Sequence, residues 1–90
     1  MLAFMPVPTL KVEGPYVRAL RDAHGYTLRT FASALQMDER QLGHIERGGR
    51  QPTPLQRVRI AKKLGVPQIA LVDATAFEAA FRRATESVAA

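Results

Sequence analysis

In the stretch 27–52, apolar residues recur at the spacing of two short helices joined by a tight turn. The first helix has Thr27 as a candidate N-cap and carries apolar residues at i, i+3, i+4 and i+7, namely Leu28, Phe31, Ala32 and Leu35. The second has Asp38 as its candidate N-cap, Leu42 and Ile45 on its buried side, and a pair of glycines to end it. This pattern is the outline of a helix-turn-helix followed by a basic loop.

Further helices are predicted on both sides of this pair. A helix is expected over residues 15–25, because a proline is tolerated at its first position and Val17 and Leu20 can both face inward. Another is expected over residues 54–64, where Thr53 supplies an N-cap. Its inner face is predicted from apolar residues at threefold spacing, namely Leu55, Val58, Ala61 and Leu64.

The two ends of the chain are predicted to differ. Residues 1–13 form an extended arm in this prediction, because Pro6 and Pro8 disfavour helix at and before themselves. Residues 67–72 form a short fifth helix, and residues 73–90 an additional C-terminal helix with an apolar stripe of Phe77, Phe81, Ala84 and Val88. The expected fold is therefore all-α, with a five-helix domain over residues 14–72 between the arm and the extra helix.

The second helix of the central pair has a narrow apolar stripe, so much of its surface is free for contacts with another molecule. The side chains left free are Glu39, Arg40, Gln41, His44 and Arg47. Side chains of these types form hydrogen bonds with base edges and phosphates. The alternative is an ordinary solvent-exposed face, and for Glu39 a role limited to complementing the helix dipole.

Segment 46–52, Glu-Arg-Gly-Gly-Arg-Gln-Pro, fits the signature Glu-x-Gly-x-Arg-x-Pro, and segment 61–66, Ala-Lys-Lys-Leu-Gly-Val, fits a fourth helix and its turn. In these two segments the chain resembles the Cro and lambda-type repressor helix-turn-helix family, also called the xenobiotic-response-element (XRE) family. The resemblance covers residues 14–72 and implies a lambda-repressor-like domain that binds the major groove of double-stranded DNA.

The resemblance also implies roles for individual residues. The expected base-contacting residues are Glu39, Arg40, Gln41 and His44. The expected phosphate-contacting residues are Thr27, Arg29, Gly43, Arg47 and Arg50, where the missing side chain of the glycine lets the helix approach the DNA backbone closely. An ion pair between Arg21 and Glu46 is expected to hold the first helix against the end of the recognition helix.

The chain departs from the family pattern at two positions. Gln36 stands where the family has a glycine at the end of the second helix, so we expect a glutamine with positive φ or a turn that closes differently. Leu28 stands where the family often has a phosphate-contacting glutamine just inside that helix. That contact is not carried over, and Thr27, Arg29 or the free N–H groups of the helix would have to replace it.

Charge supports a polyanionic partner. The 90 residues are 47% hydrophobic, enough for one small domain, and carry a formal net charge of +5. Residues 14–72 hold ten Lys or Arg against four Asp or Glu, whereas residues 73–90 hold two against three. Such a basic domain is attracted to DNA, RNA or an anionic membrane alike, and the motif spacing selects DNA.

Other classes of function find little support in the sequence. The chain has no cysteine and two separated histidines, so no disulfide or zinc site is expected. No grouping of nucleophile, base and orienting residue indicates an enzyme. The apolar opening of ten residues is too short to span a bilayer. We therefore expect a cytoplasmic protein without a cofactor, membrane contact or small-molecule ligand.

The predicted function is a sequence-specific DNA-binding transcriptional regulator, a bacterial or phage repressor that acts by occupying its operator. The alternative is an antitoxin or accessory protein that uses the helix-turn-helix as a scaffold for protein contacts. Homodimer formation is left open, because the stripe that includes Phe77 and Phe81 either packs on its own domain or forms a two-fold interface with the arm.

Overall fold

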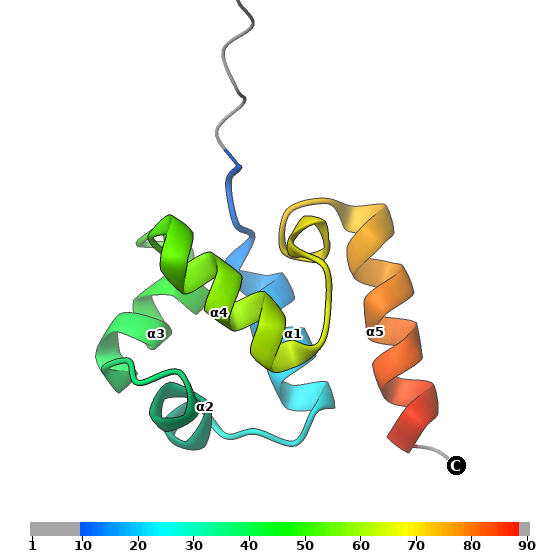
Figure 1. Ribbon diagram of the computed structural model, residues 1–90, viewed down its shortest axis with the longest axis horizontal. Coiled ribbons are helices and arrows are strands. Elements are labelled where there is room, and N and C mark those ends of the chain that lie inside the picture. The colour runs from blue at the N-terminus through cyan, green and yellow to red at the C-terminus, as the bar shows by residue number, and fades with distance from the viewer. Residues whose placement is uncertain (1–9, 89–90) are drawn as a thin grey trace, which may run out of the picture.

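The computed structural model describes residues 10–88, with side chains up to residue 86, and over this range the chain is helical (Figure 1). The elements are α1 (Gly14–Ala23), α2 (Leu28–Ala34), α3 (Glu39–Glu46), α4 (Pro54–Leu64), the one-turn 3-10 helix η1 (Gln68–Leu71) and α5 (Ala74–Val88). No strand occurs among residues 10–88. The all-α prediction is therefore confirmed. The predicted arm over residues 1–9 lies outside the described residues, and residues 10–13 are non-helical.

The core is built from the apolar sides of all five α-helices and η1. Its buried members are Val12, Val17, Leu20, Phe31, Ala32, Leu35, Leu42, Ile60, Ala61, Leu64, Ala70, Leu71 and Ala80. Most of these positions follow the i, i+3, i+4 spacing that buries one face of a helix. The central helices thus pack as an ordinary helix-turn-helix domain does.

The inner face of α4 differs from the sequence prediction. Leu64 and Ala61 are buried as expected, but Leu55 and Val58 are 59% and 41% exposed, and Ile60 is buried instead. A helix turns by 100° per residue, so residues at threefold spacing drift around it, and Leu55 lies half a turn away from Leu64. The prediction was therefore wrong for the first two members of this apolar set.

Side-chain caps begin the central helices as the sequence predicts. Thr27, Asp38 and Thr53 are the N-caps of α2, α3 and α4, and each accepts a hydrogen bond from a backbone N–H of the first turn. The turn between α2 and α3 closes with Gln36 at φ 55°, where the family pattern has glycine. Gln36 is exposed, and its Cβ atom gives this left-handed conformation a strain that glycine would avoid.

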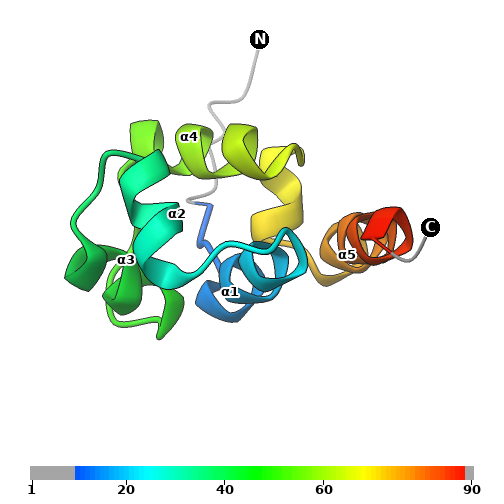
Figure 2. The ribbon, with the colours of Figure 1, turned by 90° about the horizontal axis from the view of Figure 1, so that it is seen from below.

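The predicted fifth helix over residues 67–72 is only the single 3-10 turn η1, and the fifth α-helix is α5. This C-terminal helix packs on α1 and η1 and stands on the opposite side of the molecule from α3 (Figures 1 and 2). Tyr16 of α1 stacks on Phe77 with ring centroids 4.3 Å apart, and Phe77 stacks on Phe81 at 5.6 Å. Ala84 of the predicted stripe is buried, and the side chain of Val88 lies outside the described residues. Phe77 and Ala84 therefore pack against their own chain, whereas Phe81 is 36% exposed.

Candidate nucleic-acid interface

A few apolar residues pack helix α3 against the domain, and much of its remaining surface is exposed. Leu42 and Ile45 are at most 1% exposed, so they hold the helix against the domain. Asp38 caps the helix by accepting a hydrogen bond from the N–H of Arg40 at 2.7 Å. Of the four predicted base-contacting residues, Glu39, Arg40 and His44 are exposed, and Gln41 is half-buried. The structure therefore brings these four side chains together on one short helix.

An open hollow of about 680 Å³ lies between α2 and α3. Its lining includes Leu28 from α2 and Asp38, Glu39, Arg40, Gly43, His44 and Arg47 from α3 and its ends. A Cβ atom placed on Gly43 would lie 3.2 Å from Nη1 of Arg47 and 3.7 Å from Cδ2 of Leu28. The space over the glycine is thus taken by the side chain of Arg47, which has to move if a phosphate is to approach the Gly43 backbone.

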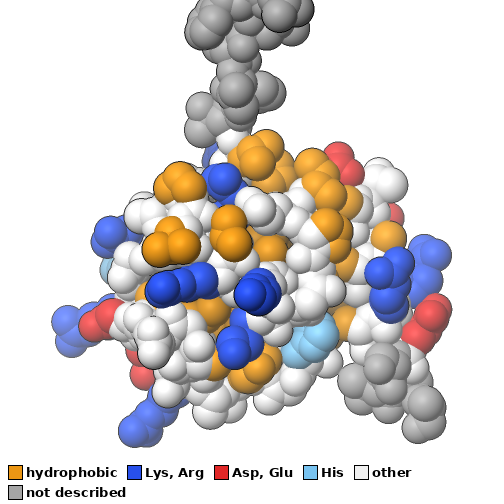
Figure 3. All heavy atoms as spheres, in the orientation of Figure 1, with side chains coloured by type: hydrophobic (Ala, Val, Ile, Leu, Met, Phe, Trp, Pro, Cys, Tyr) orange, Lys and Arg blue, Asp and Glu red, His pale blue; other side chains and the backbone are white. Residues whose placement is uncertain are grey.

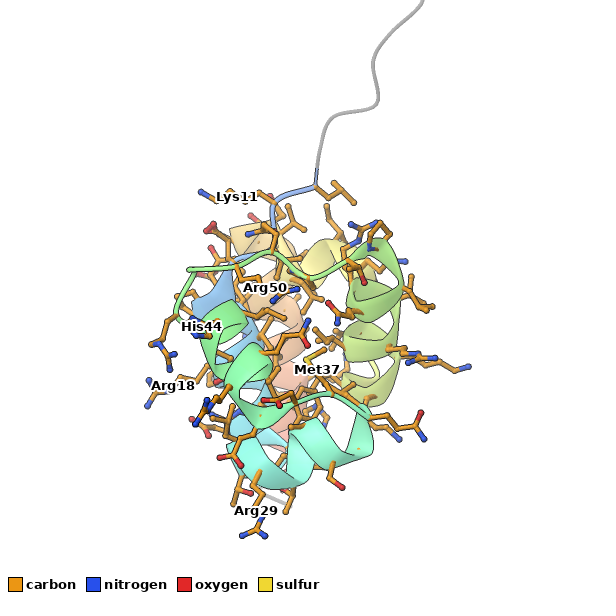
Figure 4. All side chains as sticks on the ribbon, turned by 90° about the vertical axis from the view of Figure 1, so that its left-hand side faces the viewer. Lys11, Arg18, Arg29, Met37, His44 and Arg50 are labelled. Atoms are coloured by element: carbon orange, nitrogen blue, oxygen red, sulfur yellow. The ribbon has the colours of Figure 1, made fainter. Side chains whose placement is uncertain are left out.

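Exposed cations surround α3 on this side of the molecule. Figure 4 shows Arg29 below the helix, Arg50 just above it, Arg18 at one edge and Lys11 farther up. Sequence reasoning selected Arg29 and Arg50 but missed Arg18 and Lys11. Periodicity shows that Arg18 points away from the core, but only the packing of α1 beside α3 places it on this face. Lys11 precedes the region of family resemblance.

Thr27, a predicted phosphate contact, caps the N-terminus of α2. Its Oγ1 accepts from the N–H of Thr30 at 3.0 Å, and Oγ1 of Thr30 accepts from the N–H of Thr27 at 2.9 Å. This reciprocal capping box satisfies two backbone donors at the start of α2. Thr27 is exposed beside the hollow, but its hydroxyl is already engaged within the helix.

Arg21 and Glu46 form the ion pair that the family resemblance implies. Nε and Nη2 of Arg21 donate to Oε2 and Oε1 of Glu46 at 2.7 and 3.0 Å. Each residue is 7% exposed. Nη1 of Arg21 also donates to the carbonyl oxygen of Tyr26 at 2.8 Å. The hydrogen bonds to Glu46 raise the pKa of Arg21 above its usual value, so the guanidinium stays charged and joins α1 to the last turn of α3.

Gly14 allows α1 to begin directly against the end of α3. A Cβ atom at this position would collide with the backbone carbonyl oxygens of Ile45 and Glu46. These atoms belong to the backbone of α3 and cannot rotate away as a flexible side chain can. The missing side chain of Gly14 therefore sets how closely the first helix supports the recognition helix.

Neither a cluster of metal-ligating side chains nor a helix fit to span a membrane is found in the described part of the chain. Within residues 10–86, no group of three or more His, Cys, Asp or Glu side chains is placed to hold a metal ion. Among the described helices, none combines the length and the apolar character that crossing a membrane requires.

Comparison with known families assigns the domain. The helix-turn-helix family model HTH_3 matches residues 17–67, which is more than half of the chain. The chain belongs to the HTH_3 helix-turn-helix family. This family comprises the Cro/C1-type DNA-binding domains, and the protein is accordingly a DNA-binding transcriptional regulator.

A solved structure gives independent support for the family fold. The chain is similar to the restriction-modification controller protein C.AhdI from Aeromonas hydrophila, with 28% sequence identity and a TM-score of 0.59. The match covers 62% of this chain and 85% of that one. No curated protein matches the sequence.

Proposed function

We propose that this HTH_3 protein is a sequence-specific repressor of bacterial or phage type, which occupies an operator in the cytoplasm and thereby excludes RNA polymerase. The observation that carries the proposal is the face around α3, where exposed hydrogen-bonding side chains lie between cations from neighbouring segments (Figure 4). The similarity to a controller protein supports a regulatory role.

In the proposed complex, α3 enters the major groove and its first turn and a half faces the base edges. Arg40 is suited to a bidentate contact with guanine, and Gln41 to one with adenine. His44 lies one turn further along the same helix and reaches the neighbouring base pair. Glu39 contributes only where its carboxylate accepts from a cytosine amino group, because it would otherwise repel the phosphates.

Phosphate contacts supply affinity that does not depend on sequence. Arg29 and Arg50 are exposed on opposite sides of α3. In the proposed complex they contact DNA phosphates on the two sides of the groove. Arg47 lies in the hollow between them, over Gly43. Thr27 and the Gly43 backbone complete the proposed set, the latter after the side chain of Arg47 moves.

Selection of bound sites from random duplex DNA tests this function directly. Enrichment of one defined sequence is expected, with half-sites about 10 base pairs apart if the protein binds as a dimer. An enriched operator placed over a promoter should lower transcription in a purified system. No enrichment would contradict the proposal and favour the scaffold alternative.

Replacement of Arg40 separates base reading from general affinity. Arg40→Ala is expected to cost about 1–3 kcal/mol of binding free energy on the selected site and far less on random DNA, because a lost base contact affects only the preferred sequence. Fluorescence anisotropy with the two duplexes at one salt concentration measures both losses. Equal losses on the two duplexes would instead assign Arg40 to a phosphate.

We also propose that two copies associate through α4 and η1. Leu55, Val58 and Ile69 are exposed, and apolar side chains gather over these two elements on the face in Figure 3. Helix α4 begins four residues after Arg50, so it starts close to the face around α3. A two-fold axis next to α4 would therefore let the α3 helices of both copies face one duplex. Helix α5 lies across the molecule from α3, so an interface through Phe81 would separate them (Figure 2).

Leu55→Lys is expected to shift the protein toward monomer at fixed concentration, because it places a charge in the proposed apolar interface. Sedimentation velocity measures the change in mass. Phe81→Ala is the control at an exposed apolar residue outside the proposed interface and should leave the mass unchanged. A wild-type mass for Leu55→Lys in a dimeric protein would contradict the α4 interface.

A further inference from the structure

Gln51 joins the segment before α1 to the loop after α3. Its Nε2 donates to the carbonyl oxygen of Val12 at 3.0 Å, and its Oε1 accepts from the N–H of Val12 at 2.8 Å. The side chain of Val12 is buried in the core, and the N–H of Glu13 donates to the carbonyl oxygen of Leu71 at 2.8 Å. Val12 and Glu13 are therefore a fixed part of the domain, and one amide group satisfies both backbone groups of Val12.

The loop that Gln51 holds contains two glycines and carries an exposed cation. Gly48 has φ 81°, and Gly49 follows it, so this part of the backbone has wide conformational freedom. On the helix side, the N–H groups of the two glycines donate to carbonyl oxygens of Ile45 and His44 at 3.1 and 2.9 Å. At the other end of the loop, Gln51 makes its two hydrogen bonds to the backbone of Val12. Arg50 stands between these two fixed points.

Each of the two residues joined by these hydrogen bonds directly follows a cation. Lys11 directly precedes Val12, and Arg50 directly precedes Gln51. Both side chains are exposed, and Figure 4 shows Arg50 just above α3 and Lys11 farther up on the same side of the molecule. A lysine ammonium is a compact charge without the planar geometry that reads a base, so its suitable DNA ligand is a phosphate.

We propose that Lys11 is a further phosphate contact and that Gln51 is a positioning residue, which holds Lys11 and Arg50 as a pair on the DNA backbone. This inference rests on the proposed DNA-binding function. It extends the binding surface beyond the helix-turn-helix to Lys11, three residues before α1. Gln51 itself touches the protein backbone and acts through the two cations.

The first test removes the exposed cation, which carries no risk to the fold. For the wild-type protein on random duplex DNA, the slope of log affinity against log salt concentration is expected to be about −4 to −5. Lys11→Ala should reduce the magnitude of this slope by about 0.9, the value for one phosphate contact. Lys62→Ala is the matched control, because Lys62 lies on α4 beside the end of α2 and the substitution removes the same charge.

The second test removes the positioning amide. Gln51→Leu should reduce the slope by about one to two units, because Arg50 and Lys11 both lose their fixed placement. In the Lys11→Ala/Arg50→Ala background, Gln51→Leu should change the slope no further. Gln68→Leu is the control, since Gln68 also makes a side-chain hydrogen bond, from Arg57 at 2.9 Å, but lies on η1. Hydrogen exchange at the Val12 amide should become faster only in Gln51→Leu.

The outcomes distinguish this inference from the function on which it rests. A wild-type slope near the expected value with an unchanged slope in Lys11→Ala overturns the Lys11 contact and leaves DNA binding intact. Loss of Val12 protection without any change of slope in Gln51→Leu overturns the positioning role. A wild-type slope near zero overturns both the inference and the proposed function.

Discussion

Arg21→Met is expected to lower the free energy of unfolding by about 3–5 kcal/mol, because it leaves the carboxylate of Glu46 buried without its partner. Both side chains are nearly inaccessible, and two short hydrogen bonds join them between α1 and the last turn of α3. Urea unfolding followed by circular dichroism measures the loss. DNA affinity should fall as well, since the pair fixes the orientation of the recognition helix.

The partner substitution should cost less. In Glu46→Gln, Arg21 still donates to the carbonyl oxygen of Tyr26 and remains 3.2 Å from Asp22, so its charge is not left without acceptors. The double variant Arg21→Met/Glu46→Leu should recover part of the loss, because no unpaired charge remains in the buried position. With Glu46→Leu also measured alone, additive effects of Arg21→Met and Glu46→Leu in a double-mutant cycle would show that the pair contributes no coupling.

Gly14→Ala is the second substitution with a large expected effect. Its new methyl group would overlap the carbonyl oxygens of Ile45 and Glu46, so α1 and the end of α3 must separate. We expect a loss of about 3 kcal/mol in the free energy of unfolding, at the upper end of the usual cost of overpacking, because backbone atoms cannot yield as side chains do. The thermal unfolding midpoint of the free protein measures it.

Gly43→Ala is the matched control for this prediction. Gly43 lies within α3, and a methyl group there meets only the flexible end of Arg47 and, at ordinary contact distance, Leu28. Alanine favours helix by about 1 kcal/mol over glycine, so this substitution should leave stability unchanged or raise it. Equal losses for the two glycines would contradict the argument that the contact between the α1 and α3 backbones makes Gly14 necessary.

Local signals in the sequence predicted the helices well because caps and apolar spacing act over one or two turns. Thr27, Asp38 and Thr53 begin helices as expected, and the helix-turn-helix follows from them. The predicted short helix after Pro67 is present, but for a local reason it is only one 3-10 turn long. Asp73 accepts from the N–H of Ala76 at 3.0 Å, so α5 already begins there and only one turn fits after Pro67. Gln36 adopts the positive φ inferred from its departure from the family pattern.

Tertiary packing decided which of the free surfaces come together. Spacing could show that Arg18 and the polar residues of α3 avoid the core, but the placement of Arg18 beside them depends on how α1 packs. The bonds between Gln51 and Val12 join positions 39 residues apart, and no local pattern encodes such a pair. No local pattern shows why position 14 requires glycine either, because a side chain there would collide only with the backbone of α3. Sequence thus determines the helices and their free faces, whereas contacts between distant segments assemble those faces into one surface.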